Sequence, residues 1–147
     1  MAAATLAAGV AACGGGGGSS ASVPAGADRP LPPKARIRQH WSVFFRGSTP
    51  TPERITLLQN GVKFKQALQA QSNSPLAKRS EATVSRVTLT GPKTAKVRYT
   101  ILLGGKPALA NQTGTAVKAN GLWKVSDQSF CHLLTLQGSA PPACGKG

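Results

Sequence analysis

The hydrophobic pattern of this chain of 147 residues changes its period near Glu81. Before Glu81, apolar side chains recur every three to four positions, which is the spacing of one helix face. After Glu81, apolar and polar side chains alternate, which is the spacing of a strand. A run of helices followed by a run of strands predicts an α+β domain rather than an alternating α/β fold.

Three helices are predicted before this change of period. The first spans residues 34–46, where one face is apolar and Gly47 follows as a stop. The second has Thr51 as its N-cap and ends at Gly61, and a short third helix covers residues 62–71. The apolar residues at helical spacing are the predicted core of this half: Ile37, Trp41, Phe44, Phe45, Ile55, Leu57, Leu58, Phe64, Ala67 and Leu68.

Four strands are predicted after Glu81, as an antiparallel meander. The alternation changes phase at Ser85-Arg86, which indicates a bulge or bend in the first strand. Asn120-Gly121 is a type I′ hairpin signal before the fourth strand. A terminal helix is predicted over residues 129–137, with Asp127 as its candidate cap. The predicted fold is therefore α+β, with N-terminal helices packed on a curved four-stranded antiparallel sheet and a C-terminal helix.

The N-terminal part of the chain has a different composition from the rest. All 18 Lys and Arg residues lie from Arg29 onward, and residues 1–12 are a small-residue apolar run. The sequence Val10-Ala11-Ala12-Cys13 resembles a bacterial lipobox, in which the Cys is diacylated and becomes the mature N-terminus. The alternative is an Ala/Gly-rich tail with an accidental Cys. The composition predicts a lipoprotein signal segment over 1–13, a flexible Gly/Ser/Pro tether over 14–33 and an α+β domain over 34–147.

The predicted signal peptide lacks one expected part. Secretory signals open with basic residues, and no basic residue precedes Cys13. The segment before Cys13 is also short, with only twelve residues. We therefore expect the signal peptide to begin upstream of Met1. The expected location is extracytoplasmic, with the protein anchored to the cell membrane as a lipoprotein, and secretion is the alternative. No apolar run reaches the roughly 18 residues that a spanning helix needs.

Residues that could carry chemistry are few. The chain has 4 acidic residues, which leaves little for paired-carboxylate catalysis. If Cys13 is acylated, Cys131 and Cys144 remain as an even pair, which favours a disulfide in an exported chain. Two free thiols and a metal site are the alternatives, although no C-x-x-C or H-x-x-x-H spacing supports a metal. Cys131 and His132 are consecutive on a helix and are not expected to meet as a dyad. We therefore predict no catalytic residue, metal or cofactor.

The formal net charge of +14 first suggests a polyanionic partner. The basic residues are dispersed rather than clustered, and Trp41, which lies among them, belongs to the apolar stripe. Nucleic acid is therefore disfavoured as a partner. Anionic lipid or cell-wall polymers are the expected polyanions, and the membrane is expected to hold the protein through its N-terminal lipid.

Four segments together resemble a known family. The segments are residues 41–61 (WSVFFRGSTPTPERITLLQNG), 87–101 (VTLTGPKTAKVRYTI), 112–126 (QTGTAVKANGLWKVS) and 130–144 (FCHLLTLQG…C). They are similar to actinobacterial exported proteins related to the mycobacterial low-molecular-weight secreted antigen family. The resemblance covers about residues 34–147. It implies a nuclear transport factor 2-like, cystatin-like cone, an extracytoplasmic location and no established activity.

The same resemblance suggests where a ligand would bind. In related cones, such as ketosteroid isomerases, the open end holds the ligand, and the catalytic residues are an Asp or His base with a Tyr or Asp donor. No such pair matches here, so the candidate pocket-lining residues are only Tyr99 and Trp123. We expect a non-catalytic, antigen-like domain that presents a binding surface at the cell envelope and accepts an unknown hydrophobic ligand. The alternatives are a lyase or isomerase acting in the cone, and a binder of nucleic acid or wall polyanions.

Overall fold

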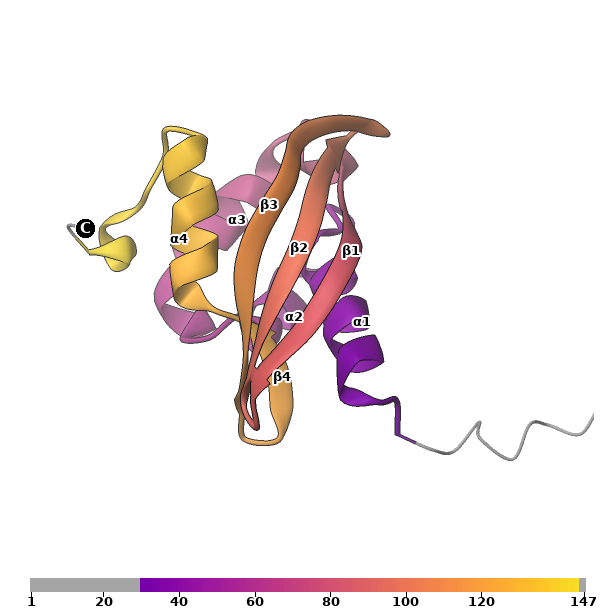
Figure 1. Cartoon of the computed structure of the whole chain (residues 1–147). Coiled ribbons are helices and arrows are strands. Elements are labelled where there is room, and N and C mark those ends of the chain that lie inside the picture. Colours follow the sequence, from indigo (N-terminus) through magenta and orange to yellow (C-terminus); the bar gives the residue numbers. More distant parts are fainter. Residues whose placement is uncertain (1–29, 146–147) are drawn as a thin grey trace, which may run out of the picture. The chain divides into compact units, whose positions relative to one another are not determined.

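The computed structural model describes residues 30–145 (Figure 1). The expected signal segment, with Cys13, and most of the expected tether lie outside these residues. The described α-helices are α1 (Pro33–Phe45), α2 (Thr51–Leu57), α3 (Lys65–Asn73) and α4 (Asp127–Leu136). The strands are β1 (Ser80–Gly91), β2 (Thr94–Leu103), β3 (Lys106–Ala119) and β4 (Leu122–Val125). Short 3₁₀ turns are η1 (Gly61–Phe64), η2 (Ala77–Arg79) and η3 (Pro142–Cys144).

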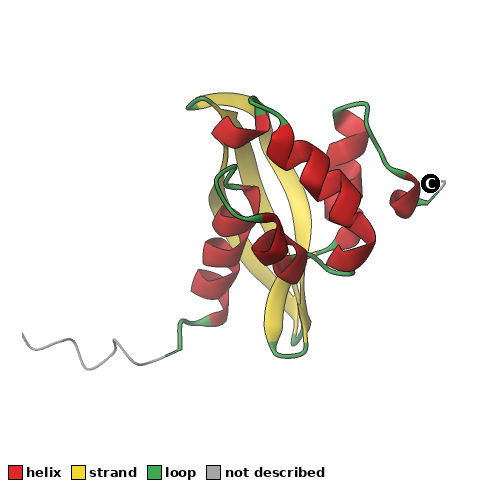
Figure 2. Cartoon of the chain, turned by 180° about the vertical axis from the view of Figure 1, so that it is seen from behind, coloured by secondary structure: helices red, strands yellow, loops and turns green. Residues whose placement is uncertain are grey.

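The four strands form one antiparallel sheet in the order β1-β2-β3-β4. The helices lie on one face of this sheet, which Figure 2 shows from the helical side. No helix of the described residues covers the other face of β1, β2 and β3 (Figure 1). The predicted α+β class and its order of elements are therefore confirmed. No helix within residues 30–145 combines the length and the apolar character that crossing a membrane requires.

The first helix forms where its apolar face predicted it, and Ile37, Trp41, Phe44 and Phe45 are all buried. It ends before Gly47, whose amide donates to the carbonyl oxygen of Ser80 at 2.9 Å. A Cβ atom on Gly47 would overlap the carbonyl oxygen of Ala77. Gly47 therefore allows the turn after α1 to pass directly against η2.

The predictions for the second and third helices were wrong in detail. Pro50, not Thr51, occupies the N-cap position of α2, and no side chain caps this helix. The helix ends at Leu57 because Leu58 turns to the sheet and forms a parallel bridge with Val125. The predicted helix over residues 62–71 is divided into η1 and α3.

The sheet confirms the local signals of the sequence. The register of β1 against β2 shifts between Val84 and Arg86, which is the predicted bulge. Asn120 and Gly121 have φ angles of 52° and 76°, the two positive values that a type I′ turn requires. Asn111 also has a positive φ, of 53°, at an irregularity between β2 and β3 that the alternation did not predict.

The C-terminal helix is capped by Ser126. The sequence prediction of Asp127 as its cap was therefore wrong. The Ser126 side chain accepts a hydrogen bond from the Ser129 amide at 3.1 Å, and Asp127 is the first helical residue. A disulfide joins Cys131, within α4, to Cys144, in η3, with a Cα–Cα distance of 5.5 Å. This bond holds η3 against the helix, as the cysteine count had favoured.

Candidate functional site

A cavity of about 490 Å³ opens between the helices and the covered face of the sheet. Its walls come from the end of α1, from α2, α3 and η2, from the start of β1, from β2 and β3, and from α4 and the residues after it. Cavities of roughly 300–1,000 Å³ are typical of small-molecule sites. The lining residues are Phe45, Arg54, Gln71, Ser74, Leu76, Ala77, Ser80, Ile101, Leu103, Ala108, Leu109, Phe130, Leu133, Leu134, Gln137 and Ser139.

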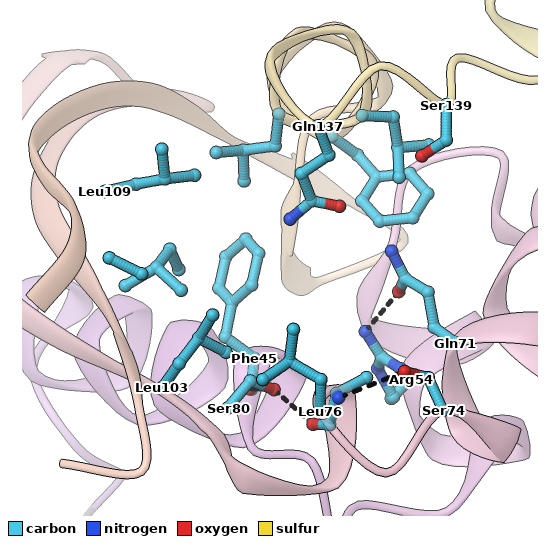
Figure 3. Close-up of a pocket in the computed structure, with 16 residues that line it drawn as sticks. Phe45, Arg54, Gln71, Ser74, Leu76, Ser80, Leu103, Leu109, Gln137 and Ser139 are labelled. Carbon is cyan, nitrogen blue, oxygen red and sulfur yellow. Dashed lines mark hydrogen bonds between the residues drawn. The ribbon is translucent and has the colours of Figure 1, made fainter. Parts of the chain in front are cut away.

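Two leucines from the sheet lie apart from Arg54 and Gln71 in this lining. Figure 3 shows Leu103 and Leu109, from β2 and β3, on one side of the space. Arg54 and Gln71 lie on the opposite side, and the amide of Gln137 points into the space between the two sides (Figure 3). The cavity therefore has apolar side chains that could contact the hydrophobic part of a ligand, and a few polar groups that could contact its polar part.

Arg54 is the only ionisable residue of the cavity lining, and it is 6% exposed. Its Nε donates to the carbonyl oxygen of Phe44 at 2.9 Å, and its Nη2 donates to Oε1 of Gln71 at 3.0 Å. The guanidinium carbon lies 5.2 Å from the centroid of the Phe44 ring, in a cation–π contact. These contacts join α1, α2 and α3. Burial lowers the pKa of Arg54 from its ordinary value, but an arginine remains charged at neutral pH.

The residues proposed from the sequence as pocket lining lie elsewhere. Tyr99 and Trp123 are buried in the core, and neither lines the cavity. The ring of Tyr99 packs against Trp41 and Phe45, with centroid distances of 5.1 and 5.5 Å. Burial raises the pKa of Tyr99, so its phenol stays protonated at neutral pH. These two side chains therefore belong to the packed core between the sheet and the helices and not to the cavity lining.

The acids and histidines lie outside the cavity as well. Asp127 accepts hydrogen bonds from the side-chain amide of Asn60 and from its neighbour Gln128, both at 2.7 Å. The Nδ1 atom of His40 is 2.8 Å from the carbonyl oxygen of Trp123, and His132 is exposed on α4. Within the described residues, no three His, Cys, Asp or Glu side chains gather as metal ligands. The cavity can bind and orient a molecule, and its lining supplies no general base.

A second feature is a shallow basic groove on the uncovered face of the sheet. Arg86 pairs with Arg98 across β1 and β2, and Thr88 pairs with Lys96. These residues line the groove together with Thr90 and Thr113 from β1 and β3, and no acidic residue is among them. Three cations on adjacent strands make this groove a candidate anion site.

Sequence reasoning missed Arg54 as a site residue. It lies three and four positions before Leu57 and Leu58, which are both buried. This spacing places a charged side chain on the apolar face of a helix, and such a position is a signal that the sequence does contain.

The comparisons with known proteins bear on the whole described domain. Neither the curated proteins nor the solved structures contain a match to the chain. A family model does match, described as low molecular weight antigen MTB12, C-terminal domain, and it covers residues 30–141. These residues include all four α-helices and all four strands, and they confirm the resemblance found in the sequence. The chain therefore belongs to the family of the MTB12 low molecular weight antigen C-terminal domain.

Proposed function

We propose that this protein is an exported, lipid-anchored and non-catalytic domain that binds a small apolar molecule at the cell envelope. Cys13 would carry the lipid, and the cavity between the helices and the sheet would hold the ligand. Membership in a family named for an antigen supports an extracytoplasmic place for the domain. The lipobox-like sequence before Cys13 supports the anchor.

The cavity itself carries this proposal. Most of its lining is apolar, and its volume of about 490 Å³ suits a small organic molecule. An enzyme of the lyase or isomerase class would need a base beside its substrate. The lining contains no Asp, Glu or His, so the arrangement favours binding over catalysis.

A neutral fluorescent probe, 1-aminoanthracene, tests the binding function. The full chain with Cys13→Ser should bind it at one saturable site, because an apolar cavity takes up the probe from water. Ala108 lines the cavity and is exposed, so Ala108→Trp should block binding without disturbing the core. Ala110→Trp is the matched control, since Ala110 is also exposed on β3 but does not line the cavity. Equal binding by both variants would contradict the proposal.

The basic groove supports a second candidate function, the binding of an anionic wall polymer. Like charges placed directly opposite in a sheet are unfavourable, and Arg86 lies opposite Arg98 without an acid in the groove. A polyanion would relieve this repulsion. The double change Arg86→Gln with Arg98→Gln should lower the salt concentration that elutes the protein from dextran sulfate. Lys78→Gln with Arg79→Gln removes the same charge from η2, and an equal effect would argue against the groove.

A further inference from the structure

The cavity lining includes a buried positive charge, that of Arg54, with no acidic partner among residues 30–145. The two hydrogen-bond acceptors of Arg54 are a backbone carbonyl and the amide of Gln71, which are both neutral. The cavity lining contains no Asp or Glu, and burial lowers the pKa of Arg54 from its ordinary value. Buried charges in proteins are normally paired because an isolated one is costly.

The described residues engage only part of the Arg54 guanidinium. Nε and Nη2 are engaged, while Nη1 has no acceptor among residues 30–145. In that part of the chain, Trp41 Nε1 is the only fully enclosed side-chain nitrogen or oxygen without a partner. The Nη1 group is therefore not fully enclosed. Arg54 is 6% exposed and lines the cavity, so a molecule in the cavity would lie beside its guanidinium.

We propose that the ligand is a carboxylate amphiphile, whose carboxylate binds the Nη1 edge of Arg54 and whose alkyl chain lies along Leu103 and Leu109. Arginine is the side chain best suited to a carboxylate, because its planar N–H groups match the two oxygens. Arg54 lies across the cavity from Leu103 and Leu109, which gives the carboxylate and the alkyl chain opposite places (Figure 3). This inference rests on the proposed function, because it names the ligand class of the same cavity.

A comparison of ligands tests the inference without any change to the cavity. Decanoate, decanol and decyltrimethylammonium are each titrated at pH 7 against bound 1-aminoanthracene on the full chain with Cys13→Ser. Decanoate should displace the probe at a concentration about tenfold below that of decanol, since a hydrogen-bonded charge pair adds at least one such factor. Decyltrimethylammonium should compete more weakly than decanol.

Two variants assign this preference to Arg54. Arg54→Gln should reduce decanoate to the level of decanol, whereas Arg79→Gln removes one exposed charge outside the lining and should leave the preference intact. Because Arg54 also joins three helices, its loss could unfold the domain. Gln71→Glu keeps Arg54 and places a carboxylate on its Nη2 group, 3.0 Å away in the present structure. This internal counter-ion should abolish the preference of the folded variant for decanoate over decanol.

The outcomes separate the two proposals. Probe binding that Ala108→Trp blocks, with decanoate no better than decanol, would overturn the carboxylate inference and leave the binding function standing. Retained preference for decanoate in a folded Gln71→Glu variant would also overturn the inference. Absence of saturable binding by the probe and by all three amphiphiles would overturn the proposed function itself.

Discussion

Gly114 on β3 is the position where the packing of this fold makes its sharpest prediction. A Cβ atom on Gly114 would lie 2.8 and 2.9 Å from the Cζ2 and Cη2 atoms of Trp41 and 3.2 Å from Oγ of Ser129. Trp41 is buried and cannot move away, because its ring is packed against Phe45 and Tyr99. Gly114→Ala therefore forces the sheet away from α1.

The magnitude follows from two opposing effects. Inserting a methyl group into a packed core costs about 1–3 kcal/mol. Replacing a glycine whose φ is not positive stabilises the folded state by about 0.4–1 kcal/mol through the unfolded chain, and Gly114 is not among the positive-φ residues. We expect Gly114→Ala to lower the free energy of unfolding by ~1–2 kcal/mol, because the overlap with Trp41 is the larger effect.

A double-mutant cycle in urea, followed by far-ultraviolet circular dichroism, tests this reasoning. Trp41→Phe removes the two ring atoms that Gly114→Ala would overlap, so the alanine should cost little or become stabilising in that background. The coupling energy between the two changes should be about 1–2 kcal/mol. Equal effects of Gly114→Ala in both backgrounds, or a gain in stability with Trp41 present, would refute the reasoning.

Three further predictions concern the core, the C-terminus and the anchor. Tyr99 is the only tyrosine, and its raised pKa means that its stabilising effect is complete below pH 10.0 and declines above it. Absorbance at 295 nm should therefore show tyrosinate appearing together with unfolding. Ionisation of the folded protein near pH 10.0 would contradict the burial of Tyr99. Replacing both Cys131 and Cys144 by Ala should lower the free energy of unfolding by up to about 3 kcal/mol, measured by urea titration, and no change would mean that the bridge holds only a freely fraying tail. Cys13→Ser should end incorporation of labelled palmitate and release the protein into the medium; continued labelling would place the lipid elsewhere.

The sequence predicted the elements well because their signals are local. The alternation in β2, the turn at Asn120-Gly121 and the apolar face of α1 each depend on neighbouring residues alone. The cap of α4 and the end of α2 were mispredicted for a different reason. Ser126 is chosen over Asp127 by the geometry at the end of β4, and α2 stops where Leu58 bridges to Val125. Contacts of this kind are set by tertiary structure, which local propensity does not encode.

The candidate site was the part that the sequence predicted least. Residues that line the cavity come from almost every element, and only the packed fold brings them together. The alternation correctly places Tyr99 and Trp123 on the inner face of the sheet, but other side chains cover them. Its charge alone predicts that Arg54 is a surface residue of an amphipathic helix, whereas its spacing from Leu57 and Leu58 indicates the buried face. The disulfide was predictable because only two cysteines remain once Cys13 is set aside.

The space between the helices and the sheet should bind one small molecule. Isotope-filtered nuclear Overhauser spectroscopy of the full chain with 1-aminoanthracene locates the bound probe. Contacts are expected from the protons of a single bound probe to the methyl groups of Leu103 and Leu109, which lie on the same side of the cavity (Figure 3). Contacts only to residues outside the cavity, or none at saturating probe, would contradict binding in this space.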